Sequence, residues 1–134
     1  MTTKPTTLHP RLIVAGAARA IDFYLEAFRA EEIDRYTGDD GKIVHAELRF
    51  DGVVLTLKDE EPGTPDVGPA PLSGSPVILT LQVADADAVA TRMEKAGATV
   101  IYPVADHPYG RMGRLRDPFG HVWMITQHPA PESG

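Results

Sequence analysis

The chain has 134 residues, a formal net charge of −6 at pH 7 and no cysteine. A chain of this length predicts a single domain over residues 1–134, and the absence of cysteine excludes a disulfide framework, a thiolate metal site and a thiol nucleophile. An acidic chain lacks the basic face that nucleic acid requires, and its apolar runs are too short to span a membrane, so we expect a cytoplasmic protein with no nucleic-acid or membrane partner.

Apolar periodicity in residues 8–58 predicts a βαβββ unit. Strands are expected at residues 8–14, 33–36, 42–50 and 53–57, and a helix at residues 17–28. Asp40-Gly41 and Asp51-Gly52 predict tight hairpin turns, because glycine adopts the positive φ that two-residue loops need.

Residues 59–75 are rich in proline and glycine and poor in large apolar side chains, which predicts a linker. Residues 76–127 then repeat the first unit, with strands at 76–83, 99–103, 113–116 and 121–126 and a helix at 86–96. Asp85 is the expected N-cap of that helix and Gly97 its stop. Residues 103–113 contain proline and glycine and are expected to form a loop. With Tyr102 and Tyr109 it either covers a ligand or is an ordinary loop with exposed tyrosines. Residues 128–134 are expected to form a frayed tail.

The two halves correspond in sequence as well as in predicted structure. Val14-Ala15-Gly16-Ala17 corresponds to Val83-Ala84-Asp85-Ala86, 69 residues later. One structural unit used twice predicts an α+β fold: two tandem βαβββ units form a curved mixed sheet with a concave ligand cup, and the helices lie on its outer face.

Specific motifs within these units resemble the vicinal oxygen chelate superfamily, which includes glyoxalase I, bleomycin-resistance proteins and extradiol dioxygenases. The motifs are Asp22-Phe23-Tyr24 and the segment Arg116-Asp117-Pro118-Phe119-Gly120-His121-Val122-Trp123. Together with His45-Ala46-Glu47-Leu48, they are most similar to the PhnB-like group. The resemblance covers residues 8–127 and implies the two-unit fold, whereas the superfamily hosts many different activities.

Alternation along the strands predicts which side chains line the cup. The residues expected to pack against the helices are Leu8, Leu12, Val14, Val53, Leu55, Leu57, Val77, Leu79, Leu81, Val83, His121, Trp123 and Ile125. The opposite faces, with their repeat equivalents, supply the predicted ligand-binding residues: His9, Arg11, His45, Glu47, Val54, Thr56, Ile78, Thr80, Arg114, Arg116, Val122 and Met124.

The resemblance also implies where a metal would bind. Metal-dependent relatives place histidine and glutamate ligands at the four positions occupied here by His9, Thr56, Ile78 and Met124. Of these, His9 is the one good donor, so we expect no metal and no other cofactor. The alternative is a divalent metal site rebuilt from His9, His45 and Glu47.

Two functional hypotheses follow. The first is a homodimeric binding protein whose half-apolar cup holds an amphiphilic small molecule. The second is a lyase, isomerase or dioxygenase-type enzyme with His45 and Glu47 as catalytic residues, aided by a metal or by Arg114. Arg114 and Arg116 are expected at the repeat positions of His45 and Glu47, where guanidinium groups suit an anionic oxygen. A solvated strand face and salt-bridged surface arginines would explain these four residues nearly as well.

Overall fold

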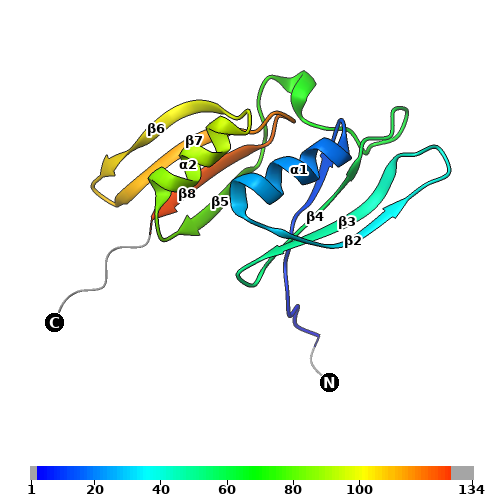
Figure 1. Ribbon diagram of the computed structural model, residues 1–134, viewed down its shortest axis with the longest axis horizontal. Coiled ribbons are helices and arrows are strands. Elements are labelled where there is room, and N and C mark those ends of the chain that lie inside the picture. Colours follow the sequence, from blue (N-terminus) through cyan, green and yellow to red (C-terminus); the bar gives the residue numbers. More distant parts are fainter. Residues whose placement is uncertain (1–2, 128–134) are drawn as a thin grey trace.

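The chain forms two successive βαβββ units (Figure 1). In the computed structural model, which describes residues 3–127, the first unit contains β1 (Arg11–Val14), α1 (Ala17–Phe28), β2 (Glu31–Thr37), β3 (Ile43–Phe50) and β4 (Val53–Asp59). The second contains β5 (Ile78–Val83), α2 (Ala86–Lys95), β6 (Thr99–His107), β7 (Gly110–Arg116) and β8 (Val122–Gln127). The predicted tail, residues 128–134, lies outside the described residues.

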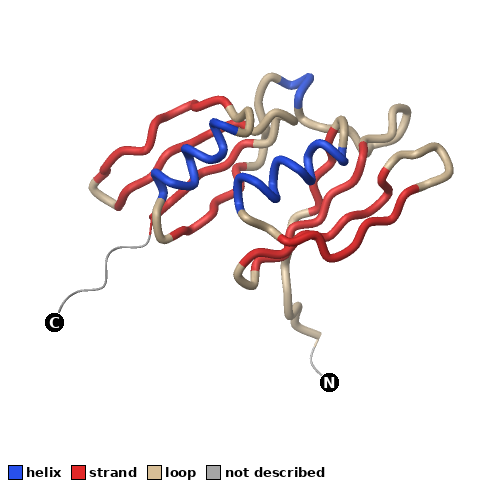
Figure 2. Tube along the Cα trace, viewed as in Figure 1, coloured by secondary structure: helices blue, strands red, loops and turns tan. Residues whose placement is uncertain are grey.

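Each unit builds its own four-stranded mixed sheet (Figure 2). The strand order is β1-β4-β3-β2 in one sheet and β5-β8-β7-β6 in the other, and only the β1–β4 and β5–β8 pairs are parallel. The predicted α+β fold of two βαβββ units is therefore confirmed. Over residues 3–127 the strands divide into two sheets that share no strand pair. One face of each sheet packs against its helix, and we call the other its open face.

The two helices begin in equivalent ways. At the start of α1, the amides of Gly16 and Ala17 donate to Asp59 Oδ1 at 3.1 and 2.7 Å. The α2 amide of Ala86 donates to Gln127 Oε1 at 3.0 Å, and Gln127 ends β8 as Asp59 ends β4. These side chains satisfy amides that have no partner inside the helix. Neither helix, nor any other helical segment in residues 3–127, is long and apolar enough to cross a membrane.

The predicted ends of α2 are confirmed. Asp85 is its N-cap and accepts from the Ala88 amide at 3.1 Å. The helix ends at Lys95, and Gly97 follows with a φ of 118°. Both signals are local to the sequence, which is why they could be read from it.

Residues 103–113 form a β-hairpin, so the prediction of a covering loop there was wrong. β6 extends to His107 and β7 begins at Gly110. Gly113 lies against β6 so closely that an added Cβ would sit 2.8 Å from Val104 Cγ2. Gly113 therefore permits close backbone contact between two strands.

Side-chain alternation is correct within the strands and fails at their ends. Leu12 and Val14 are buried as expected, whereas Leu8 precedes β1 and is 98% exposed. Val77 precedes β5 and is 58% exposed, and Val53, at the first position of β4, is 38% exposed. Alternation decides burial only where a strand has a helix above it.

A buried aromatic cluster and one carboxylate join the two units. The rings of Tyr24 and Phe28, from α1, lie 5.8 and 5.0 Å from the Trp123 ring of β8. Asp117 Oδ2 accepts from Tyr24 Oη at 2.5 Å and from Trp123 Nε1 at 2.9 Å. Its Oδ1 accepts from the amides of Phe119 and His121 at 2.9 and 3.0 Å. Asp117 therefore fastens the β7–β8 turn to α1 across the boundary between units.

The Tyr24–Asp117 contact predicts a specific alkaline response. Burial, aided by the Asp117 charge, raises the pKa of Tyr24 well above its usual value. Above about pH 10 an unfolded tyrosine loses its proton while the folded one keeps it, so stability falls as pH rises, by up to about 1.4 kcal/mol per pH unit. Tyr24→Phe should remove this component of the slope in urea unfolding between pH 9 and 11. Tyr109→Phe, at a 77% exposed position, should leave the slope unchanged; equal slopes in both variants would contradict the assignment.

The linker is folded against both units. Lys58 Nζ, at the end of β4, donates to Glu61 at 2.5 Å and to Asp66 at 2.7 Å. The linker contains a short 3-10 helix, Ala70–Leu72, whose first residue packs against Gly120 of the β7–β8 turn. These ion pairs and backbone contacts hold the linker against the two units, whereas its proline- and glycine-rich composition predicted only a connecting segment.

Candidate functional site

The predicted ligand-binding residues lie on the open faces of two different sheets. In the first sheet Arg11 pairs with Thr56, which pairs with Glu47, so the three lie in one row across β1, β4 and β3. In the second sheet Thr80 pairs with Met124, which pairs with Arg114. A neighbouring row contains Ile78, Val122 and Arg116. These three rows contain nine of the twelve predicted residues. His45 on β3 and Val54 on β4 lie on the same open face by alternation with Glu47 and Thr56, and His9 precedes β1.

On the open face of the first sheet the polar groups satisfy one another. Arg11 Nη1 lies 2.6 Å from His45 Nδ1, and Arg11 Nη2 donates to the Val44 carbonyl at 2.9 Å. Because a guanidinium group can only donate, His45 Nδ1 is the acceptor in this contact. Glu47 accepts from Arg49 Nε at 2.8 Å. Both predicted catalytic side chains are therefore engaged with arginines.

The donor set does not fit a metal of the kind the superfamily uses. His9 is exposed and precedes β1, and the Thr56 hydroxyl donates to the Pro10 carbonyl at 2.8 Å. Ile78 and Met124 supply no nitrogen or oxygen. In residues 3–127 no group of three or more histidine, aspartate or glutamate side chains is arranged so that it could hold a metal ion, and this includes His9, His45 and Glu47 within one chain.

On the open face of the second sheet, neither Arg114 nor Arg116 forms an ion pair within residues 3–127. Arg114 and Arg116 lie two residues apart on β7, and the Nε atom of each is buried without a hydrogen-bond partner in the described part of the chain. The Arg114 guanidinium lies 5.4 Å from the centre of the Tyr102 ring. By contrast Arg111, on the helix-covered face of the same strand, pairs with Asp87 at 2.8 Å. Guanidinium groups held in this way can receive an oxyanion.

The repeat assignment of these arginines was wrong by two residues. Thr56 and Met124 are equivalent positions; Glu47 pairs with the first and Arg114 with the second. Arg114 therefore corresponds to Glu47, and Arg116 corresponds to Arg49. The segments before β3 and β7 differ in length, so the offset of 69 residues seen at the start of the repeat does not extend to these strands.

Lys58 is an open-face residue that sequence reasoning missed. It follows Thr56 at the alternate position of β4 and is 6% exposed, with its ammonium group bound by Glu61 and Asp66. Strand alternation placed it on this face, but its two carboxylate partners come from the linker. Their charges neutralise Lys58, which leaves Arg114 and Arg116 as the open-face cations best placed for a ligand.

The aromatic and histidine residues of the last motif have structural positions. Trp123 is 2% exposed and belongs to the core. The His121 amide supports the Asp117 turn, and its ring Nε2 donates to the Ile13 carbonyl of β1 at 2.9 Å. This motif therefore connects the two units.

Known proteins share both this sequence and this architecture. Protein Mb0911c of Mycobacterium bovis is 45% identical over 124 residues, which cover 90% of this chain and 82% of that protein. The crystal structure of TioX from Micromonospora sp. ML1 matches with a TM-score of 0.71 at 26% identity, covering 93% of this chain and 100% of that chain.

The resemblance to PhnB-like proteins is confirmed at the level of the fold. The PhnB protein of Bacillus cereus matches with a TM-score of 0.73 at 17% identity, covering 92% of this chain and 100% of that chain. A family model described as the Glyoxalase/Bleomycin resistance protein/Dioxygenase superfamily matches residues 6–125. The chain belongs to the glyoxalase/bleomycin resistance protein/dioxygenase superfamily.

Proposed function

We propose that the protein binds a small amphiphilic molecule with an anionic or carbonyl oxygen, without a metal, in a cup that two chains form as a homodimer. The observation that carries this proposal is that the Nε atoms of Arg114 and Arg116 are buried and have no hydrogen-bond partner within residues 3–127. A buried donor without an acceptor costs roughly 1–3 kcal/mol, and a ligand oxygen would remove that cost. Comparing ligand binding by the wild type and by Arg114→Ala tests the proposal.

The neighbours of these arginines suit the apolar part of such a ligand. Met124 lies beside Arg114, and Val122 beside Arg116. Ile78, on the adjacent edge strand β5, is 44% exposed. Apolar surface next to a few convergent polar groups is typical of small-molecule sites.

An enzymatic function has less support. A lyase, isomerase or dioxygenase of this superfamily would need a free base or a metal to act on its substrate. In this chain His45 Nδ1 accepts from Arg11 and Glu47 pairs with Arg49, so neither predicted catalytic group is free. A binding function requires neither group as a base. A location in the cytoplasm agrees with a chain that has no cysteine.

We expect a homodimer in solution. The open faces carry apolar side chains such as Ile78 that a second copy would cover, and equivalent surfaces on two copies favour a two-fold pair. Sedimentation equilibrium at micromolar concentration should give twice the chain mass. Ile78→Lys, which places a charge in the expected interface, should shift the equilibrium toward monomer. A wild-type protein that remains monomeric at micromolar concentration and above would overturn the dimer.

We also expect no tightly bound divalent metal at the four inherited positions, because Ile78 and Met124 offer no donor atoms suited to one. Elemental analysis of purified protein should find Ni, Zn, Fe and Mn well below one ion per chain. Stoichiometric metal that disappears in His9→Ala would show that the site is metal-dependent after all.

A further inference from the structure

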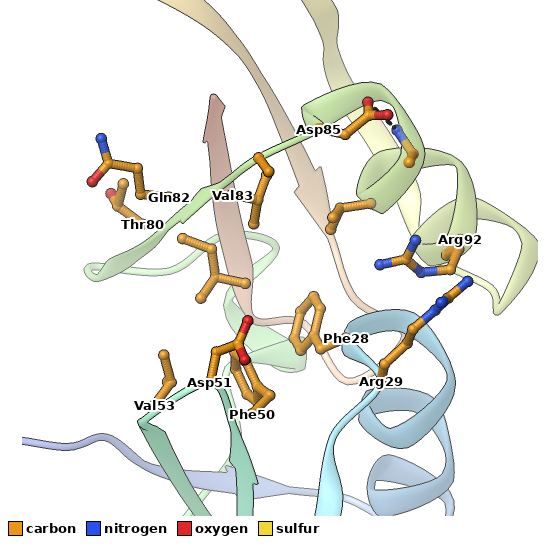
Figure 3. Close-up of a pocket in the computed structure, with 14 residues that line it drawn as sticks. Phe28, Arg29, Phe50, Asp51, Val53, Thr80, Gln82, Val83, Asp85 and Arg92 are labelled. Carbon is orange, nitrogen blue, oxygen red and sulfur yellow. Dashed lines mark hydrogen bonds between the residues drawn. The ribbon is translucent and has the colours of Figure 1, made fainter. Parts of the chain in front are cut away.

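A pocket of about 860 Å³ lies at the junction of the two units (Figure 3), and neither Arg114 nor Arg116 lines it. The end of α1, the β3–β4 hairpin, strand β5 and the α2 residues from Ala88 to Arg92 form its walls. Its volume falls within the roughly 300–1,000 Å³ of small-molecule sites. Of the twelve residues predicted to bind a ligand, Thr80 alone lines it. The pocket is thus distinct from the open-face arginine site.

The floor of the pocket is aromatic. The rings of Phe28 and Phe50 lie 5.5 Å apart, and Figure 3 shows both between the two units. Val53, Leu81 and Val83 extend the apolar surface onto β4 and β5. Such a surface would bury a hydrocarbon or aryl group of a ligand.

One end of the pocket is cationic. The side chains of Arg29 and Arg92 lie next to each other there, opposite Thr80 and Gln82 (Figure 3). Arg92 Nε donates to the Ala27 carbonyl at 3.1 Å, which orients the guanidinium group and leaves its Nη atoms available. Among the described residues neither arginine forms a salt bridge. Two adjacent guanidinium groups are suited to a carboxylate, sulfonate or phosphate.

The backbone of Arg29 supports a role for its side chain. Arg29 is the C-cap of α1 with a φ of 54°, a left-handed conformation that glycine adopts without strain. The positive charge of Arg29 near the helix C-terminus is stabilising and offsets part of that strain. Replacement by glycine would remove both the strain and the charge, so the free energy of unfolding should stay close to that of the wild type. The arginine is therefore not needed to end the helix.

We propose that this pocket binds an amphiphilic anion, with its head group on Arg29 and Arg92 and its apolar body against Phe28 and Phe50. The two acidic residues of the pocket, Asp51 and Asp85, do not oppose an anionic head group at the arginine end. Asp85 is occupied as the N-cap of α2. Asp51 lies beside Phe50, away from the arginine end of the pocket (Figure 3).

The test compares two probes that share an aromatic body: 8-anilinonaphthalene-1-sulfonate and N-phenyl-1-naphthylamine, which lacks the sulfonate. Fluorescence titration should show that Arg29→Gly and Arg92→Ala each weaken sulfonate binding by about tenfold. Their affinity for the neutral probe should stay the same, and Arg29→Gly should keep the wild-type melting temperature. Lys95→Ala removes the same charge from an exposed position at the end of α2 and should leave both affinities unchanged.

Several results would overturn this site. One is sulfonate binding that is absent in the wild type, unaffected by Arg29→Gly, or weakened equally by Lys95→Ala, which would indicate a general charge effect. Another is sulfonate binding that is lost in Arg114→Ala and retained in Arg29→Gly, which would assign the probe to the open face of the second sheet. Because Arg29→Gly relieves backbone strain, we expect this variant to fold. It therefore tests the site even if Arg92→Ala does not fold.

Discussion

Asp117→Ala is expected to lower the free energy of unfolding by roughly 3–5 kcal/mol. The carboxylate accepts four hydrogen bonds, from Tyr24 Oη, Trp123 Nε1 and two turn amides, and Asp117 is 2% exposed. Alanine would leave these donors without an acceptor in the core, at roughly 1–3 kcal/mol for each group that water cannot reach. Urea unfolding can be followed by the fluorescence of Trp123, the single tryptophan of the chain.

The matched control is Asp87→Ala on α2. Asp87 also pairs with a cationic side chain, Arg111, at 2.8 Å, but its own side chain is 55% exposed. An exposed ion pair contributes about 0–1 kcal/mol, so this variant should lose at most that amount. Asp117→Asn keeps one acceptor oxygen, so its loss in the free energy of unfolding should lie between those of Asp117→Ala and Asp87→Ala. Similar losses in Asp117→Ala and Asp87→Ala would show that the buried network does not hold the units together.

Arg114→Ala should weaken binding of an anionic ligand by about ten- to a hundredfold and leave the fold intact. The variant removes a charge-assisted hydrogen bond to the ligand, while losing no ion pair among the described residues. Ligands would first be found by thermal-shift screening of aryl and alkyl carboxylates and phosphonates, then titrated by calorimetry. Met124→Ala should lower affinity across chemically different ligands, because it removes apolar contact rather than a charge.

Arg111→Ala provides the control for charge. Arg111 lies on the same strand as Arg114, but on the face that pairs with Asp87 of α2. Its loss removes one positive charge without touching the open face, so ligand affinity should stay at the wild-type level. Unchanged affinity in Arg114→Ala and in Glu47→Gln alike would show that these residues are ordinary strand-face charges and that the ligand is recognised elsewhere.

Much of the fold could be predicted because its signals are local. The alternation that buries Leu55 and Leu57 has a period of two residues, and α2 is bounded by Asp85 and Gly97 within its own segment. Such patterns depend on the backbone conformation of a few neighbouring residues. Helix capping by Asp59 is different, because its carboxylate meets α1 across 42 residues of sequence. No local pattern marks that contact.

The sequence by itself determined which side chains share a face, and therefore that His45, Glu47, Arg114 and Arg116 would lie on the open faces of their sheets. Tertiary structure alone decided which of them are free. Arg11 engages His45 and Arg49 engages Glu47, whereas Arg114 and Arg116 keep their Nε atoms unpartnered within residues 3–127. The physical reason is that a polar or charged side chain forms a hydrogen bond only with a complementary group within about 3 Å of it. Which groups come that close depends on strand register and on contacts between distant segments.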